Sequence, residues 1–141
     1  MAFQKRGHEV LGIDLGTEYI EKGKSIHGVP LVVGASSSLL REHRGKFDVV
    51  LLCHALEHFT DIKKELVVIR ELMAPRGLLY IEVPGIKNLR HSYQHDFLRF
   101  LQNAHMHHFT LGTLRQVLAR YGFEIVSGNE RINSIEAIPK P

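Results

Sequence analysis

A chain of 141 residues with 44% hydrophobic and 23% charged residues is long enough for one domain with a core, and this composition excludes a disordered protein. The formal net charge of +3 comes from 18 basic and 15 acidic residues that are interleaved, so we expect no nucleic-acid partner. The single cysteine excludes an internal disulfide. No apolar run approaches the ~20 residues needed to span a bilayer, so we expect no membrane partner.

The sequence carries neither internal repeats nor low-complexity segments, and we expect residues 1–141 to form a single domain. Residues 1–10 are too polar to supply the apolar core of a secretory signal. Together with the lone cysteine, this predicts a protein of the reducing cytoplasm.

The first third of the chain alternates short strands with short helices. In chain order, the predicted elements are the end of a helix over 1–6, a strand over 9–14, a helix over 16–24, a strand over 31–33 and a helical turn over 36–42. Gly7 suits the C-cap of the first helix. The strand over 9–14 ends in Asp14, which predicts a carboxylate at the carboxyl end of a strand.

The strongest predicted strand is the apolar run 47–52, which ends abruptly at Cys53 and His54. A short apolar run of this kind is typical of a strand buried in a parallel sheet. In open α/β sheets the ligand lies at the carboxyl ends of such strands. Cys53 and His54 therefore occupy a position where chemistry is expected.

Strands and helices continue to alternate in the second half of the chain. The predicted elements are a helix over 60–74 capped by Thr60, a strand over 78–83, a helix over 110–121, and strands over 123–126 and 132–138 joined by a turn at Gly128-Asn129. A long polar connection covers 84–108. The alternation predicts an α/β fold with a mostly parallel sheet and crossover helices, to which the closing hairpin adds an antiparallel edge strand.

Four stretches in this order resemble the small-molecule branch of the class I S-adenosylmethionine-dependent methyltransferases. They are VLGIDL (Val10–Leu15), FDVVLLCHALEHF (Phe47–Phe59), LMAPRGLLYIEVP (Leu72–Pro84) and HHFTLGTLRQVLARYGFEIV (His107–Val126). They correspond to the family's second strand, its fourth strand, the entry to its fifth strand and the segment before its sixth. The resemblance implies a doubly wound Rossmann-like sheet that ends in a reversed hairpin strand, with S-adenosylmethionine as the cofactor.

Three departures from the family pattern accompany this resemblance. The glycine-rich loop after the family's first strand is absent, so a strand-loop-helix unit of about 30 residues is missing and we expect an N-terminally incomplete domain. Arg76 stands where the family usually has glycine. Gly34-Ala35 stands where the family often has an acid that binds the adenine amino group.

The resemblance assigns Asp14 to the ribose hydroxyls of the cofactor, as acids do in dinucleotide-binding folds. The alternative role for Asp14 is to cap a helix. The resemblance places Leu15, Gly34, Ala35 and Ser36 against the adenosine. These four are also ordinary turn residues, and the Ser36 hydroxyl is a candidate replacement for the missing acid.

At the end of the strong strand, the resemblance implies backbone contact between Cys53 and the methionine portion of the cofactor. It places His54 against the reacting groups. An imidazole, with an unperturbed pKa near ~6.5, suits a general base at neutral pH, so His54 is the candidate catalytic residue. The alternative is a structural histidine. We expect His58 to be structural, packing or hydrogen-bonding near the start of the next helix.

The long connection and its exit are rich in histidine, at positions 91, 95, 105, 107 and 108. Metal binding is one interpretation, because imidazoles and the nearby Asp96 are capable ligands. The spacing is not compact, however, and long loops of this fold usually cover substrate. We therefore predict no metal site and name Tyr93, His95 and His108 as candidate substrate contacts.

The leading functional hypothesis is methyl transfer to an oxygen or nitrogen atom of a small molecule. The second is a non-catalytic or truncated methyltransferase-like domain that associates with another chain, because an exposed sheet edge where the first strand belongs invites pairing into a homo-oligomer. A third is a nicotinamide-dependent oxidoreductase, which also uses an acid after its second strand. The stretches 72–84 and 107–126 do not suit it.

Overall fold

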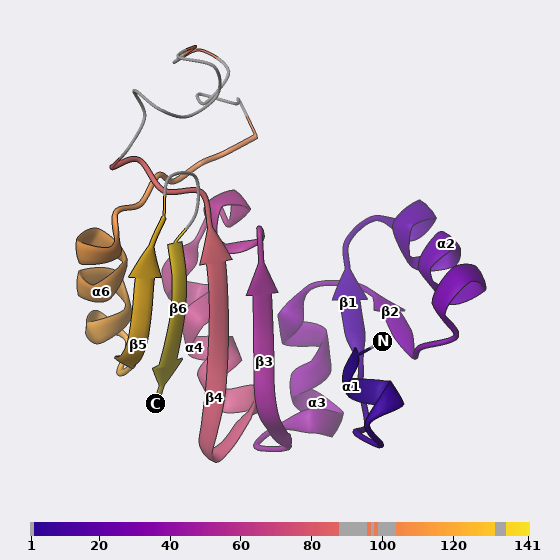
Figure 1. The fold of residues 1–141 in the computed structure, drawn as a ribbon. Coiled ribbons are helices and arrows are strands. Elements are labelled where there is room, and N and C mark those ends of the chain that lie inside the picture. The colour runs from indigo at the N-terminus through magenta and orange to yellow at the C-terminus, as the bar shows by residue number, and fades with distance from the viewer. Residues whose placement is uncertain (1, 88–95, 97, 99–103, 132–134) are drawn as a thin grey trace. The chain divides into compact units, whose positions relative to one another are not determined.

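The computed structural model describes residues 2–87, 96, 98, 104–131 and 135–141 (Figure 1). The chain divides into two compact units, Met1–Glu42 and His43–Pro141, which are described separately below. Both combine parallel strands with crossover helices, which confirms the predicted α/β fold class.

The first unit is built around two short parallel strands, β1 (Gly12–Asp14) and β2 (Leu31–Val33). Its other elements are α1 (Ala2–Lys5), α2 (Thr17–His27), η1 (Ser36–Leu39) and the start of α3 (Leu40–His43). A Cβ atom at Gly12 or Gly23 would collide with the side chain of Leu31, so both glycines permit close packing against β2. Ile20 of α2 is buried as its position predicts, whereas Tyr19 beside it is exposed.

The second unit contains a four-stranded sheet with the order β3-β4-β6-β5. The strands are β3 (Phe47–Cys53), β4 (Met73–Val83), β5 (Glu124–Glu130) and β6 (Ile135–Lys140). Strands β3 and β4 are parallel, and β6 is antiparallel to both of its neighbours, β4 and β5. A parallel sheet that contains one reversed strand agrees with the Rossmann-like fold.

The hairpin at the end of the chain differs from the prediction in two ways. Gly128 and Asn129 do not form its turn but lie in β5, opposite Ala137 and Glu136. The antiparallel strand is also not at the edge of the sheet, because β6 lies between β4 and β5. Alternate residues of β6 are buried while β5 is mostly exposed, so the interior position suits β6.

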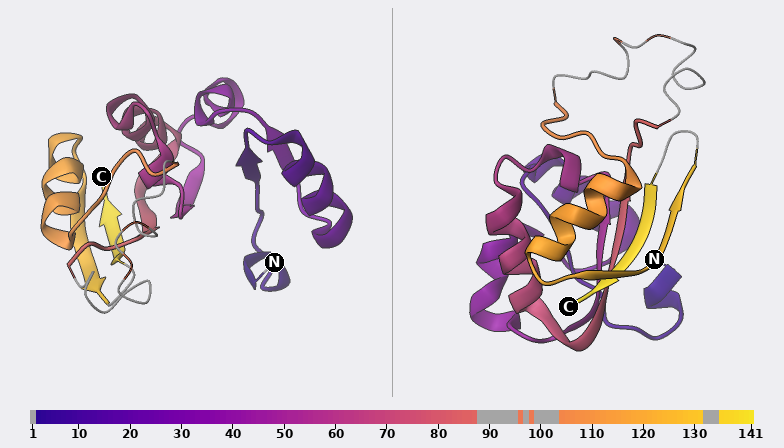
Figure 2. Two further views of the ribbon diagram at one scale, coloured as in Figure 1. Left: turned by 90° about the horizontal axis from the view of Figure 1, so that it is seen from above. Right: turned by 90° about the vertical axis from the view of Figure 1, so that its left-hand side faces the viewer.

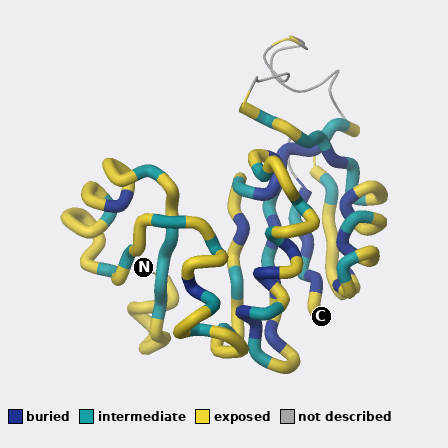
Figure 3. Tube along the Cα trace, turned by 180° about the vertical axis from the view of Figure 1, so that it is seen from behind, coloured by how far each residue is buried: buried dark blue, intermediate teal, exposed yellow. Residues whose placement is uncertain are grey.

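Two helices cover one face of this sheet, α4 (Ile62–Leu72) and α6 (Leu111–Arg120), as the right-hand view of Figure 2 shows. Buried residues of both helices belong to one hydrophobic core with the inward residues of the strands (Figure 3). The main contributors are Leu66, Ile69, Leu114, Leu118, Leu79, Ile81, Val83 and Ile135. On β3 and β4, Val49, Leu51 and Leu78 are exposed, which leaves apolar side chains where a doubly wound sheet carries a second layer.

The helix boundaries refine the predicted ones. The N-cap of α4 is Asp61, not Thr60, because the Asp61 carboxylate accepts a hydrogen bond of 3.0 Å from the backbone N–H of Lys64. The helix ends at Leu72 because Met73 already pairs with Phe47 in the sheet. Thr110 caps α6 in a reciprocal capping box with Thr113, as expected of a helix entry.

Arg76 lies in the turn before the main part of β4, and its backbone conformation is one that glycine adopts more easily. Arg76 has a φ of +68°, a left-handed conformation that costs a side-chain-bearing residue about 1–2 kcal/mol. Replacing it with glycine removes this strain but increases the freedom of the unfolded chain, so we expect Arg76→Gly to raise the free energy of unfolding by up to about 1 kcal/mol. Urea denaturation followed by circular dichroism measures the change.

The matched control is Arg76→Ala, which removes the exposed side chain and keeps the strained backbone. This substitution should leave the unfolding free energy nearly unchanged. Equal effects of Arg76→Gly and Arg76→Ala would contradict the claim that the backbone at position 76 is strained. Gly77→Ala should be destabilising, because its Cβ would lie 3.0–3.3 Å from the backbone oxygens of Ala74, Phe47 and Asp48.

Candidate functional site

The carboxyl end of β3 carries a strained residue, His54. Its φ is +50°, in the left-handed region that few residues other than glycine adopt. The conformation is held in place because the His54 N–H donates a hydrogen bond of 2.8 Å to the carbonyl oxygen of Glu82 on β4. Strain of this kind persists only where surrounding structure enforces it, and it concentrates at functional sites.

The imidazole of His54 lies between two carboxylates. Its Nδ1 is 3.4 Å from Oε1 of Glu57, and its Nε2 is 3.6 Å from Oε1 of Glu82. The side chain is 55% exposed, whereas that of Glu57 is only 1% exposed. The ring is therefore oriented from both sides and still accessible to a substrate.

Glu82 also influences two titratable groups in its neighbourhood, Tyr80 and Cys53. The Tyr80 hydroxyl donates to Glu82 Oε2 at 3.1 Å, and burial together with this hydrogen bond raises the pKa of Tyr80. Partial burial, with a smaller contribution from the Glu82 charge, raises the pKa of the Cys53 thiol. Cys53 is therefore a poor nucleophile at neutral pH, which leaves the backbone contact as its predicted role.

Glu57 is a site residue that the sequence did not predict. Both of its carboxylate oxygens are buried and have no hydrogen-bond partner among the described residues. Burying a carboxylate is costly unless a positive charge or hydrogen-bond donors compensate. The nearest candidates for compensation are imidazoles, those of His54 and of His58, whose Nε2 is 3.9 Å from Glu57 Oε1.

A segment distant in the sequence, 104–109, contacts the turn that carries Glu57. The backbone N–H groups of Met106 and His107 donate to the carbonyl oxygen of Glu57 at 2.8 and 3.1 Å. The Nδ1 of His58 donates to the carbonyl oxygen of Ala104 at 2.8 Å, so His58 hydrogen-bonds as a structural histidine is expected to do. These bonds bring His105 beside His58, with 4.9 Å between the ring centroids.

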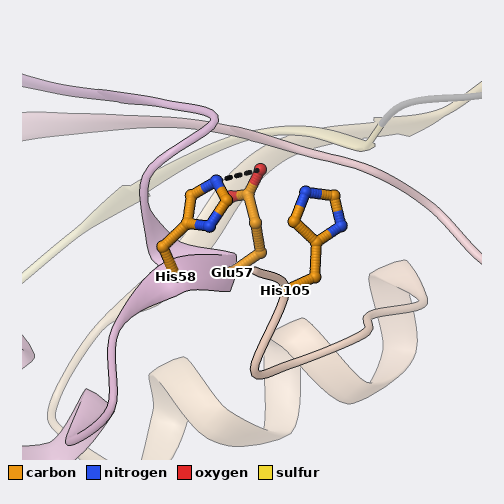
Figure 4. A group of neighbouring side chains, drawn as sticks. All are labelled: Glu57, His58 and His105. Atoms are coloured by element: carbon orange, nitrogen blue, oxygen red, sulfur yellow. Dashed lines mark ion pairs between the residues drawn. The ribbon is translucent and has the colours of Figure 1, made fainter. Parts of the chain in front are cut away.

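Figure 4 shows that the imidazoles of His58 and His105 lie on either side of the Glu57 carboxylate. The Nδ1 atom of His105 is buried and lacks a hydrogen-bond partner in the described part of the chain. Burial is the main cause that lowers the pKa of His105, which favours the neutral form of this imidazole. One ligand atom from each of the three side chains lies within 4.8 Å of the others.

In the first unit, the predicted adenosine-binding positions meet at the carboxyl ends of β1 and β2. The Gly34 N–H donates to the carbonyl oxygen of Asp14 at 2.9 Å. The Asp14 carboxylate accepts a hydrogen bond of 2.7 Å from the Gly16 N–H through Oδ1, which fixes its position at the start of α2. Leu15 follows with 75% of its surface exposed.

The predicted site residues fall into three groups. Asp14, Leu15 and Gly34–Ser36 come together in the first unit, and Cys53 and His54 lie at the end of β3 in the second. The ring of His108 lies 6.2 Å from that of His105, near the Glu57 carboxylate. Tyr93 and His95, the other candidate substrate contacts, lie outside the described residues.

A family model described as a methyltransferase domain matches residues 1–128. The chain belongs to this methyltransferase domain family. The match covers most of the chain and confirms the family predicted from the four sequence stretches, in preference to a nicotinamide-dependent oxidoreductase. A search of curated proteins gave no match.

Several solved structures with a similar fold are titled methyltransferases. An S-adenosylmethionine-dependent methyltransferase from Archaeoglobus fulgidus superimposes with a TM-score of 0.75 at 16% identity, over 99% of this chain and 79% of that one. The 1,6-didemethyltoxoflavin-N1-methyltransferase of Burkholderia thailandensis, solved with S-adenosylhomocysteine bound, gives a TM-score of 0.72 at 20% identity over 98% of this chain and 63% of its own. These similarities establish the fold.

The raised pKa of Cys53 has a measurable consequence. Because Cys53 is the single cysteine of the chain, alkylation by iodoacetamide reports on it alone. At pH 7.5 we expect alkylation to be slower than that of free cysteine, although the side chain is exposed, since less thiolate is present. The rate should continue to rise at pH values where free cysteine has already levelled off.

Glu82→Gln should speed the alkylation at pH 7.5 because it removes the neighbouring negative charge, and Glu18→Gln in the first unit is the matched control. Alkylation at the rate of free cysteine in the unsubstituted chain would show that the local environment does not protect the thiol.

Proposed function

We propose that this chain transfers a methyl group from S-adenosylmethionine to an oxygen or nitrogen atom of a small molecule. The observation that carries the proposal is His54, an exposed imidazole held in a strained conformation at the carboxyl end of β3, between Glu57 and Glu82. In a member of a methyltransferase family, this is where a group that handles the acceptor is expected.

The residues of the first unit suit the adenosine portion of the cofactor. Oδ1 of Asp14 already binds Gly16, but a carboxylate has further lone pairs, so Asp14 retains the capacity to accept hydrogen bonds from ribose hydroxyls. The exposed Leu15 offers an apolar surface for the nucleoside. Gly34, Ala35 and Ser36 follow the neighbouring strand and line the same end of β1 and β2.

In the second unit, His54 has the role of orienting the acceptor and taking its proton. The cofactor supplies a methyl group activated by a sulfonium centre, so positioning contributes most of the rate. A base is needed where the acceptor has to lose a proton. After His54 takes up that proton, the carboxylates of Glu57 and Glu82 are placed to accept its N–H groups.

The acceptor is proposed to be a small molecule bound under the segment that precedes α6. The Burkholderia thailandensis enzyme with the same fold is titled a methyltransferase of 1,6-didemethyltoxoflavin, which is a small molecule. Tyr93, His95 and His108 remain the proposed substrate contacts. Among the described residues, no helix has the length and apolarity to cross a membrane, and the cytoplasmic location expected from the sequence is part of this proposal.

The variants Asp14→Asn and His54→Ala distinguish an effect on cofactor binding from an effect on methyl transfer. We expect S-adenosylhomocysteine to bind the chain with a micromolar dissociation constant, measured by calorimetry, and Asp14→Asn to weaken it about tenfold or more by removing a charged acceptor. His54→Ala should change this affinity little but slow methyl transfer about 100-fold or more. Transfer is followed with methyl-labelled S-adenosylmethionine and a panel of phenols, alcohols and amines.

Asp48→Asn and His27→Ala change exposed residues of the same types and are the controls. Failure of S-adenosylhomocysteine to bind the folded chain would reject the proposal in favour of a non-catalytic methyltransferase-like domain. Unchanged transfer by His54→Ala would remove His54 as the base.

The second candidate function is a domain that associates with another copy through a sheet edge. It is favoured by β3, which pairs with β4 alone among the described strands and carries the exposed side chains of Val49 and Leu51. We expect a dimer or larger species of the 141-residue chain in size-exclusion chromatography with light scattering. A folded monomer at all concentrations would contradict this association.

A further inference from the structure

We propose that Glu57, His58 and His105 form a binding site for a divalent transition-metal ion such as Zn²⁺. The Glu57 carboxylate is 1% exposed, and its two oxygens lack hydrogen-bond partners among the described residues. A buried carboxylate needs a compensating positive charge or donors. A cation bound at its oxygens supplies that charge directly.

The histidine nitrogens beside Glu57 are suited to be metal ligands. His58 donates its Nδ1–H to the carbonyl oxygen of Ala104 at 2.8 Å, and this fixes the tautomer in which Nε2 carries a lone pair. Metal-binding histidines characteristically donate their second ring N–H to a carbonyl or carboxylate in this way. The Nε2 atom lies 3.9 Å from Glu57 Oε1, on the side where an ion would be held.

His105 completes the set from the other side of the carboxylate, as Figure 4 shows. Its Nδ1 is buried and has no hydrogen-bond partner in the described ranges, so it is a third unpaired polar atom beside the two Glu57 oxygens. The three ligand atoms lie within 4.8 Å of one another. Around a tetrahedral ion with bonds of about 2.1 Å, ligand atoms are about 3.4 Å apart, so a closure of roughly 1 Å or slightly more would bring them onto the ion.

The chemical type of the ligand atoms determines which metal ions the site prefers. Two imidazoles and one carboxylate favour Zn²⁺ and its first-row neighbours over Ca²⁺ and Mg²⁺, which prefer oxygen ligands. Three protein ligands leave at least one coordination position for a ligand from outside the chain, which is the pattern of a reactive rather than a structural site. This site lies next to His54, whose Nδ1 is 3.4 Å from Glu57 Oε1.

The proposed metal site cannot be recognised from the sequence spacing of its ligands, because one of them lies far from the other two along the chain. Glu57 and His58 are adjacent, but His105 arrives from the far end of the long connection. It is brought there by the hydrogen bonds that Met106 and His107 donate to the Glu57 carbonyl oxygen. The metal ligands therefore depend on a backbone contact between segments about 50 residues apart.

Zinc binding by the metal-free chain tests the site without cofactor or acceptor, so its outcome does not depend on the proposed methyl transfer. The chain is treated with a chelator, dialysed and titrated with ZnCl₂ in a calorimeter, with Tm measured in parallel. We expect one Zn²⁺ per chain with a micromolar or lower dissociation constant and a rise in Tm. His105→Ala and Glu57→Gln should each weaken binding about 10- to 100-fold.

His27→Ala, which removes an exposed histidine of the first unit, is the matched control and should leave the affinity unchanged. His105→Ala alters a side chain on a segment outside helices and strands, so it tests the site even if Glu57→Gln fails to fold. The proposal is overturned if the folded chain binds no Zn²⁺, or if His105→Ala binds it as tightly as the unsubstituted chain does.

Discussion

The burial of one carboxylate, that of Glu57, is the constraint on which the candidate site depends. The residue occupies η2 (Leu56–His58), the short turn after β3, where Leu56 beside it is fully buried and forces the turn inward. A charge in this position requires compensation, and the imidazoles of His54, His58 and His105 lie nearby. Its carbonyl oxygen meanwhile accepts the two hydrogen bonds that hold segment 104–109 in place.

The Glu57 carboxylate also lies beside His54, the residue proposed to act on the acceptor. The carboxylates of Glu57 and Glu82 lie near the two ring nitrogens of His54, whose backbone is in the left-handed region. The first unit shows a simpler version of the same arrangement, with Asp14 and Gly34 at the carboxyl ends of its parallel strands. In both units, the predicted cofactor-binding residues lie at the end of a strand of a parallel pair, as the general rule for open α/β sheets requires.

Elements with a strong periodic signal were predictable from the sequence, and contacts over long distances were not. The apolar run 47–52, the amphipathic helices and the Thr110 cap follow from local patterns. Gly128-Asn129 has the composition of a hairpin turn, yet pairing with β6 keeps both residues in the strand. Glu57 was missed because a three-residue turn has no period and because its burial depends on residues 104–109.

Amide chemical-shift mapping with S-adenosylhomocysteine tests most directly the claim that the strand ends bind the cofactor. In a ¹⁵N-labelled chain, the account predicts that the largest shifts occur at Asp14, Leu15 and Gly34–Ser36 in the first unit and at Cys53 and His54 in the second. Shifts that are absent from these positions, or that concentrate on the outer surfaces of α4 and α6, would contradict it.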